Sequence, residues 1–176
     1  KTVIVEINRG FVAPAGGLAI DPNRIDYAFE SDASLPEIAL PQLDDASLRI
    51  GERVAGLIQD GDCLQTGIGA IPAAILGQLT HKNDLGLHGG LLDGGGQALI
   101  QSGNVTGQRK AIDQGQHVTG MALGDHAFFN WLSDASDVVF RSANYTHYVD
   151  IIRQLDQFVS INSAVEVDLF GQVNAE

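Results

Sequence analysis

Two glycines stand where a short apolar run gives way to a helix-type segment, and their neighbours could form an anion-binding turn. Gly67 and Gly69 follow the apolar pair Cys63 and Leu64, and Pro72 opens the next apolar segment. This order predicts a strand, a tight turn and a helix, because the fixed φ of proline suits the first helical position. The backbone N–H groups of such a turn could hold a phosphate, a carboxylate or the oxyanion of an acyl-transfer intermediate. An ordinary strand-to-helix turn is the alternative, since the spacing lacks the third glycine of a dinucleotide site and the lysine of a P-loop.

Other residue types that carry chemistry are sparse in this chain. Cys63 is the single cysteine, so an internal disulfide is excluded and a cytoplasmic location is the simplest fit. It has no partner histidine nearby in the sequence, which predicts a small core residue rather than a nucleophile. The five histidines are dispersed, at His81, His88, His117, His126 and His147. Their spacing matches no zinc site, and no metal is predicted.

The composition narrows the class of protein. The chain has 176 residues, of which 44% are apolar, enough for one large domain or for one domain plus a fragment. Its 22 acidic and 10 basic residues give a net charge of −12, which argues against nucleic acid or an anionic membrane as a partner. No apolar run reaches the ~18 residues of a membrane span, and no signal peptide is recognisable. The chain opens and stops abruptly, so we expect it to be part of something longer.

Strand-type and helix-type segments alternate after residue 45. Strands are expected at 84–89, 117–123, 137–141 and 158–161, and a hairpin or bulged strand at 165–173. Helices are expected at about 45–60, from Pro72 onward, and at 97–102, 125–132 and 148–155. In the first of these, Leu48, Val54, Leu57 and Ile58 are expected to face inward. The alternation predicts an α/β fold with an open, largely parallel sheet and helices on both faces.

Ligands bind such sheets at the carboxyl ends of the strands. The predicted rim therefore contains residues 67–70, 89–96, 123–125 and 142–146. Glycines 94–96 are expected to form a loose loop there.

The region of residues 31–45 predicts a domain boundary. It contains two prolines, several acids and no repeating apolar face, as is typical of an extended, exposed linker. Residues 1–30 and 46–176 would then belong to different domains. The β-branched run at 2–7, separated from its own domain, is expected to pair with a sheet edge or with another chain.

Several stretches of this sequence carry a family resemblance: VIVEIN, RIDYAFESDASLPE, IGERVAGLIQDGDCLQTGIGAIPAAIL, LGLHGG, RSANYTH and INSAVEVDLFGQVNAE. In them the chain resembles the acetyl-CoA hydrolase/transferase family, which includes the acetate and 4-hydroxybutyrate CoA-transferases. Members have two CoA-transferase-type α/β domains. The resemblance implies that residues 1–30 are the tail of an N-terminal domain, 31–45 a linker, and 46–176 an incomplete C-terminal domain.

The resemblance also implies an activity. Members transfer CoA between an acyl-CoA, of acetyl-CoA or 4-hydroxybutyryl-CoA type, and a carboxylate through a glutamyl-CoA thioester. The CoA thioester is then a substrate, and no covalently bound cofactor is expected. Partners would be these small molecules, together with further copies of the chain or a missing N-terminal domain. The oxyanion would be met by backbone groups of Gly67, Ile68, Gly69 and Ala70.

At one position the chain departs from the family pattern. The nucleophile belongs two residues after the histidine, in a His-Thr-Glu pattern, and this chain reads His88-Gly89-Gly90. Natural divergence and deliberate alteration are both compatible with Gly90. His88 and Asp93 are the nearest candidates to orient a water for slow hydrolysis, although a histidine on a strand end is more often a hydrogen-bonded scaffold residue. The rival interpretation is a non-catalytic CoA-binding or subunit-packing domain.

The remaining candidates lie in segments that the resemblance assigns to the rim. Substrate contact is expected from Gly89, Gly90, Asn144 and Tyr145, with His147 beside them, and rim hydrogen bonding is the alternative. Glu166 and Asp168 match family positions in VEVDL. Their spacing of two puts both on one face of a strand, where a paired structural role is expected rather than catalysis.

Overall fold

The computed structural model describes residues 1–11, 13–34, 36–38 and 41–175. Its main sheet contains β3 (Cys63–Thr66), β4 (Gly86–Leu87), β6 (His117–Thr119), β8 (Val138–Phe140) and β9 (Phe158–Ile161). All the pairings are parallel: β3 lies between β4 and β9, β6 pairs with β8, and a bridge between His88 and Val118 joins the two groups. The order is therefore β9–β3–β4–β6–β8.

Two short strands extend this sheet beyond its carboxyl edge. β5 (Leu91–Leu92) follows β4, β7 (Met121–Ala122) follows β6, and the two pair in parallel. The sequence predicted one strand over residues 117–123, and the structure instead interrupts it at Gly120. Opposite this break lies Gly90, whose carbonyl accepts a hydrogen bond from the Met121 N–H at 2.9 Å. Two neighbouring strands are thus interrupted side by side.

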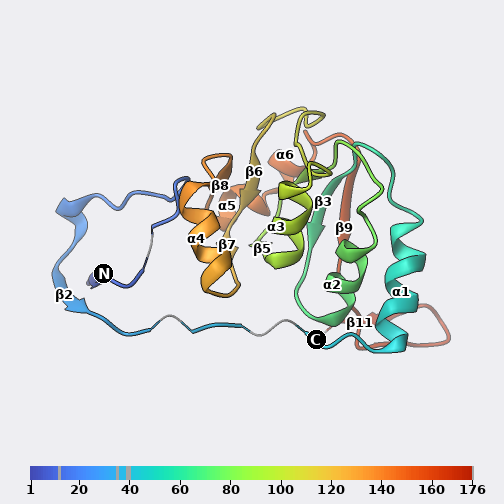
Figure 1. Ribbon diagram of the computed structural model, residues 1–176, viewed down its shortest axis with the longest axis horizontal. Helices are drawn as coiled ribbons and strands as arrows, with labels where there is room; N and C mark the ends of the chain where they lie inside the picture. Colours follow the sequence, from blue (N-terminus) through green and yellow to red (C-terminus); the bar gives the residue numbers. More distant parts are fainter. Residues whose placement is uncertain (12, 35, 39–40, 176) are drawn as a thin grey trace.

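Helices cover both faces of the sheet, as the sequence predicted. Figure 1 shows α1 (Asp45–Ala55), α2 (Ala70–Gly77), α3 (Gly94–Gln101) and α4 (His126–Asp134) in front of the strands. The shorter α5 (Ala143–Thr146) and α6 (Val149–Ile152) lie behind them. The predicted helix over 148–155 is therefore shorter, with Tyr148 at its N-cap. The open, largely parallel α/β fold is confirmed.

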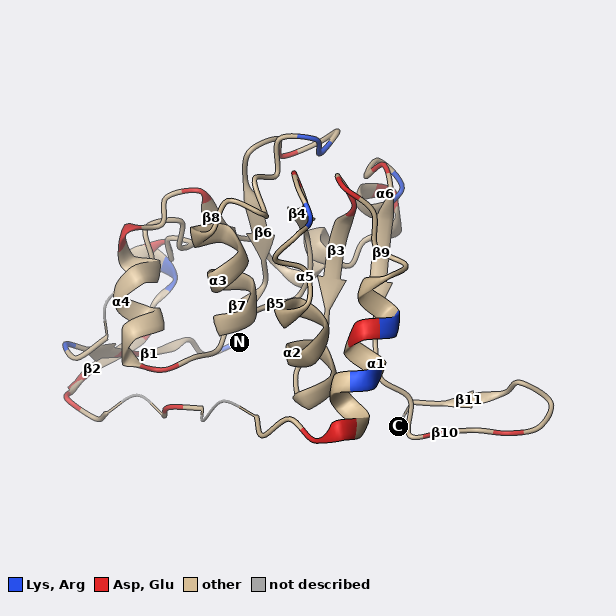
Figure 2. Ribbon diagram, turned by 45° about the vertical axis from the view of Figure 1, so that its right-hand side comes forward, with Lys and Arg blue, Asp and Glu red and all other residues tan. Residues whose placement is uncertain are grey.

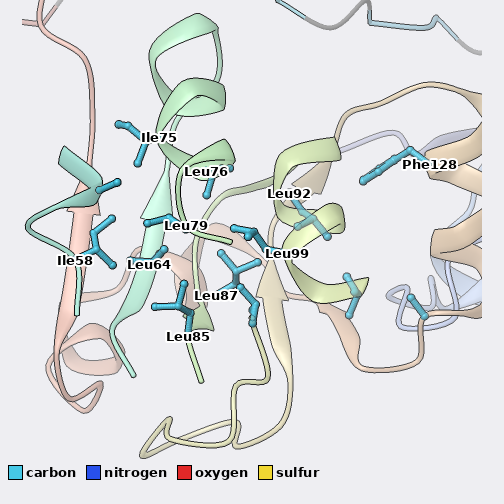
Figure 3. Close-up of a cluster of buried hydrophobic side chains, with 14 of the residues drawn as sticks. Ile58, Leu64, Ile75, Leu76, Leu79, Leu85, Leu87, Leu92, Leu99 and Phe128 are labelled. Carbon is cyan, nitrogen blue, oxygen red and sulfur yellow. The ribbon is translucent and has the colours of Figure 1, made fainter. Parts of the chain in front are cut away.

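The hydrophobic core lies between the strands and helices α1 to α4. Side chains of alternate strand residues point into it, because successive residues of a strand face opposite sides of the sheet. Figure 3 shows Leu64, Leu85 and Leu87 from the strand side meeting leucines and isoleucines of the helices. Leu64 and Ile75 have no exposed surface. Helices α2 and α3 carry no charged residue, and the charges gather on α1 and the loops (Figure 2).

Helix α1 packs through small residues rather than through the leucines that the sequence indicated. Its buried positions are Ser47, Gly51 and Ala55, and a Cβ at Gly51 would lie 2.8 Å from the backbone of Ala74 in α2. Val54 and Ile58 contact the core as expected, but Leu48 and Leu57 are exposed. The prediction for those two was wrong because close helix contact favours the smallest side chains. The helix also ends at Ala55, earlier than predicted.

The N-terminal segment forms a small sheet of its own. β1 (Ile4–Asn8) pairs in parallel with β2 (Tyr27–Ser31), and the short η1 (Pro22–Arg24) lies between them. The expected strand at 2–7 thus pairs within the chain, with a strand that the sequence did not suggest. The connection touches the main body at Gly16, whose carbonyl accepts from the Phe140 N–H at 3.0 Å. Figure 1 shows this small sheet beside, and not within, the main sheet.

Two extended segments complete the chain. Between β2 and α1 the described residues form neither helix nor strand and are mostly exposed; positions 35, 39 and 40 of the predicted linker lie outside the described residues. β10 (Glu166–Val167) and β11 (Val173–Asn174) form the expected hairpin, which extends away from the body in Figure 2. In the described part of the chain, the helices are all too short or too polar to cross a membrane.

Candidate functional site

The glycine turn after β3 has the form that the sequence predicted. Gly69 has φ 109° and ψ −171°, a region that side chains other than glycine hardly enter. Helix α2 then begins at Ala70, so Pro72 is its third residue rather than its first. Proline is tolerated there because the first N–H groups of a helix have no intrahelical partner. Within the described chain, the N–H groups of residues 67–70 donate to no other residue. They remain free to meet an anion, and their binding role stays a prediction.

Gly90 lies at the same edge of the sheet as this turn. β3 and β4 are neighbouring parallel strands that pair Leu64 with Leu87; the glycine turn follows the first strand, and Gly90 follows the second. A Cβ at position 90 would lie 2.7 Å from Cε1 and 3.0 Å from Nε2 of His147. The imidazole therefore fills the space that any side chain at position 90 would need. Gly120 closes the other side, because a Cβ there would lie 3.1 Å from the Gly90 carbonyl oxygen.

His88 is enclosed beneath this rim. Its ring has no exposed surface and packs 5.9 Å from the ring of Tyr145 and 6.4 Å from that of Phe158, measured between centroids. Neither ring nitrogen finds a hydrogen-bond partner among the described residues, so the ring is not the hydrogen-bonded scaffold that we expected. Burial lowers the pKa of His88 to about 4, and the nearby Lys110 cation acts in the same direction. The imidazole is neutral at pH 7 and does not face solvent.

Asp93 has a structural task. It is the N-cap of α3, and its Oδ1 accepts a hydrogen bond from the Gly96 N–H at 3.1 Å. The three glycines that we expected in a loop therefore form the first turn of α3, which starts at Gly94. The cap explains this difference, because an aspartate three residues ahead satisfies an N–H that would otherwise lack a partner.

Asn144, Tyr145 and His147 are brought to the same rim by α5. Asn144 is exposed, and the Tyr145 hydroxyl donates to Oδ2 of Asp113 at 2.8 Å. Burial and this hydrogen bond raise the pKa of Tyr145. Nδ1 of His147 lies 2.7 Å from Oγ1 of the buried Thr146. The structure thus gathers the rim residues that the sequence indicated, while the contact between His147 and position 90 was not foreseen.

Sequence reasoning missed Lys110. It is buried, and its Nζ donates to the Leu87 carbonyl at 3.2 Å and to the Gln116 carbonyl at 2.8 Å. These carbonyls immediately precede His88 and His117, so one ammonium ties together the strands that carry both histidines. Burial lowers the pKa of Lys110. Gly86 was the available signal: a glycine inside a strand marks a close approach, and a Cβ there would lie 2.9 Å from Cγ of Lys110.

The other candidates are structural. Cys63 is buried, as predicted, and burial raises the pKa of its thiol to about 11. Asp168 is not paired with Glu166: its Oδ1 closes the hairpin turn by accepting from the N–H groups of Phe170 and Gln172. Glu166 instead accepts from the Asn174 side chain at 3.3 Å. In the part of the chain that the structure covers, His, Cys, Asp and Glu form no group of three that could hold a metal ion.

The cavity beneath the rim is small. It measures about 10 Å³ and is lined by His88, Gly89, His117 and Thr119, among others, which is room for about one water molecule. A substrate group would have to lie on the open edge above it, between the glycine turn and Gly90.

Comparison with known proteins bears on the whole chain. Residues 124–176 match the family described as acetyl-CoA hydrolase/transferase, C-terminal domain. Over 100% of its length the chain is 36% identical to the 4-hydroxybutyrate coenzyme A transferase of Clostridium kluyveri, of which it covers 41%. The resemblance to the acetyl-CoA hydrolase/transferase family is confirmed. The chain is also 34% identical to the succinyl-CoA:cyclohexane-1-carboxylate CoA transferase of Geobacter metallireducens, of which it covers 40%.

Solved structures of related proteins have the same fold. RipA from Yersinia pestis matches with a TM-score of 0.91 at 35% identity, over 99% of this chain and 41% of that one. A 4-hydroxybutyrate CoA-transferase from Porphyromonas gingivalis matches with a TM-score of 0.90 at 33% identity, over 98% of this chain and 44% of that one. The chain therefore spans about two fifths of the length of the Clostridium and Geobacter transferases.

Proposed function

We propose that the carboxyl edge of the main sheet binds the thioester end of an acyl-CoA. The observation that carries this proposal is the turn at 67–70 at the carboxyl end of β3, whose N–H groups donate to no other described residue. Such donors stabilise the negative charge that develops on a thioester oxygen under attack. The relatives named as CoA transferases support the choice of a CoA thioester over other anions. Asn144 and Gly90 would line the acyl group at the rim, whereas Gly89 is buried beneath it.

We further propose that this chain does not use a glutamyl-CoA intermediate. Position 90 has no carboxylate, and the His147 ring occupies the space beside it. Asp93, the nearest carboxylate in sequence, is held as the cap of α3. Because a covalent nucleophile and its supporting groups act as a unit, its loss leaves only binding and the oxyanion donors. A non-catalytic CoA-binding or subunit-packing role is the second candidate, and the same absence of a carboxylate favours it.

The test uses titration calorimetry with 2-oxopentyl-CoA, a ketone with a methylene group between the sulfur and the carbonyl, which cannot be hydrolysed but keeps the carbonyl oxygen. S-butyl-CoA, a thioether without that oxygen, reports the binding of the rest of the molecule. Gly69→Ala forces a side chain into a backbone conformation that only glycine adopts easily, so the N–H groups of the turn should move. We expect its affinity for 2-oxopentyl-CoA to fall about tenfold, which is the value of one hydrogen bond, and its affinity for S-butyl-CoA to change little. Gly77→Ala is the matched control, because a Cβ there meets nothing within 4 Å at an ordinary φ.

Thermal melts of both variants would confirm that each is folded. Equal affinity of Gly69→Ala and the parent for 2-oxopentyl-CoA would contradict the assignment of the turn. If the parent does not bind S-butyl-CoA at all, the acyl-CoA proposal is wrong. Intact mass after incubation with butyryl-CoA should show no CoA adduct on the chain.

The domain organisation is a separate proposal. We infer that residues 1–30 belong with a further N-terminal domain, that 31–45 form a linker, and that 46–176 form most of a second domain. The coverage of about two fifths of each relative supports this. The small sheet of β1 and β2 also exposes Ile4, Ile7, Tyr27 and Phe29, which a packed neighbour would cover. The 176-residue chain should therefore self-associate in sedimentation velocity, and a clean monomer at high concentration would argue against an uncovered docking surface.

A further inference from the structure

The imidazole of His147 stands where a side chain at position 90 would otherwise project. The two nearest ring atoms to a Cβ built on Gly90 are Cε1 at 2.7 Å and Nε2 at 3.0 Å. The edge of the ring that carries Nε2 therefore faces the glycine at the centre of the rim. His147 is exposed as a residue, so its side chain lies at the surface of the molecule, where a ligand can reach it.

The ring is held in this orientation by its own helix. Nδ1 lies 2.7 Å from the hydroxyl of Thr146, which is buried. When Nδ1 carries the proton and donates it to that hydroxyl, Nε2 is left as an acceptor. A neutral imidazole in this tautomer can take a proton from a water molecule on the Gly90 side.

The neighbouring polar groups cannot accept a proton from a water molecule at Gly90. His88 is fully buried, Asp93 accepts from the Gly96 N–H, and Tyr145 donates to Asp113. Arg141 lies over the Tyr145 ring, with 5.9 Å between the guanidinium carbon and the ring centroid, and it is a cation without a basic atom at neutral pH.

We propose that His147 is the general base of a hydrolytic reaction at this edge, which rests on the proposed binding of acyl-CoA. Nε2 takes a proton from water as the water oxygen bonds to the thioester carbonyl carbon. The N–H groups of residues 67–70 meet the oxyanion of the tetrahedral intermediate. The intermediate then breaks its carbon–sulfur bond, and the CoA thiolate takes the proton back from the imidazolium. One water and one thioester give one carboxylic acid, which ionises in solution, and one CoA thiol.

Glycine at position 90 fits this chemistry, because a side chain there would displace the His147 ring. The structure therefore links two features of the sequence, Gly90 and His147, in one site: the first leaves room for the ring, and the second activates the water.

The test compares His147→Gln with the parent in butyryl-CoA hydrolysis. Released CoA is detected with a thiol reagent, to which the buried Cys63 contributes little background. We expect kcat to fall at least ~100-fold, the usual contribution of a general base, while the affinity for S-butyl-CoA changes less than about threefold. The matched control is His81→Gln, an exposed histidine in the turn after α2, which should keep the parent rate.

Two further measurements separate a base from a structural residue. Added imidazole should restore part of the rate of His147→Gly. Gly90→Ala, whose Cβ would push the ring aside, should also lower kcat with little change in S-butyl-CoA affinity.

Two outcomes would overturn the proposal. His147→Gln could hydrolyse butyryl-CoA at the parent rate, or the parent could bind S-butyl-CoA without hydrolysing butyryl-CoA. Each of these leaves acyl-CoA binding intact and removes only the role of His147. Failure of the parent to bind S-butyl-CoA would instead remove the proposed function, and with it this inference.

Discussion

The two faces of the main sheet are built from the same strands and have opposite characters. Leu64, Leu85 and Leu87 point to the face under α1 to α4, where the contacts are almost entirely aliphatic. The residues between them point to the face under α5, where Gly86 makes room for Lys110 and His88 packs on Tyr145. Alternation along a strand therefore separates the part that stabilises the fold from the part that holds polar groups. It also explains how buried ionisable groups are tolerated here: they share one layer and leave the other undisturbed.

The largest effect that would test this separation is a cavity on the aliphatic face. Leu64→Ala removes a side chain with no exposed surface, so the free energy of unfolding should fall by about 2–5 kcal/mol. Urea unfolding followed by circular dichroism would measure it. Leu57→Ala, at a side chain that is 79% exposed, should change stability by less than about 0.5 kcal/mol.

The separation predicts that Leu64→Ala, where it remains folded, keeps the affinity of the parent for S-butyl-CoA. A loss of affinity in proportion to stability would show that the two faces are not independent.

A smaller effect, expected only on the polar face, is a dependence of stability on pH. The pKa of His88 is about 4 in the folded protein and about 6.5 in an unfolded chain. As pH falls below about 6.5 the unfolded state therefore binds a proton that the folded state excludes, and the loss of stability is complete near pH 4. Between pH 7 and pH 5 this costs about 2 kcal/mol.

The measurement is urea unfolding at both pH values for the parent and for His88→Gln, which cannot titrate. The parent should lose about 2 kcal/mol more than the variant over this interval. Since burial also lowers the pKa of His117, a decline of the same sign should remain in the variant. Identical pH dependence of the two proteins would show that His88 is protonated, or exposed to water, in the fold.

Most of the framework could be predicted from local patterns. The strand at Phe158–Ile161, the glycine turn before α2, the cap at Asp125 and the hairpin after Val165 each follow from residue types within a few positions. The spacing of apolar residues, the helix caps and the turn residues act over a few positions, so a single sequence is enough to predict these elements.

What could not be predicted depends on contacts between distant segments. Leu48 and Leu57 have the apolar character of core residues, but the close approach of α2 selects Gly51 and its small neighbours instead. Lys110 is far from Gly86 in the chain, and only the fold reveals that the missing side chain of one accommodates the stem of the other. The contact between His147 and Gly90 is of the same kind. The rim residues could be predicted because they follow strands in the sequence. Which of them contact one another could be seen only in the three-dimensional structure.

The paired interruption of the two strands has a consequence for sequence variation. Gly90 and Gly120 face each other across the break, with the carbonyl of one against the bare Cα of the other, and His147 closes the space on the far side. A larger side chain at position 90 would collide with the ring at position 147, and one at position 120 would collide with the Gly90 carbonyl. Substitutions at positions 90, 120 and 147 are therefore expected to be coupled, and a related protein with a larger residue at position 90 is expected to differ at position 147 as well.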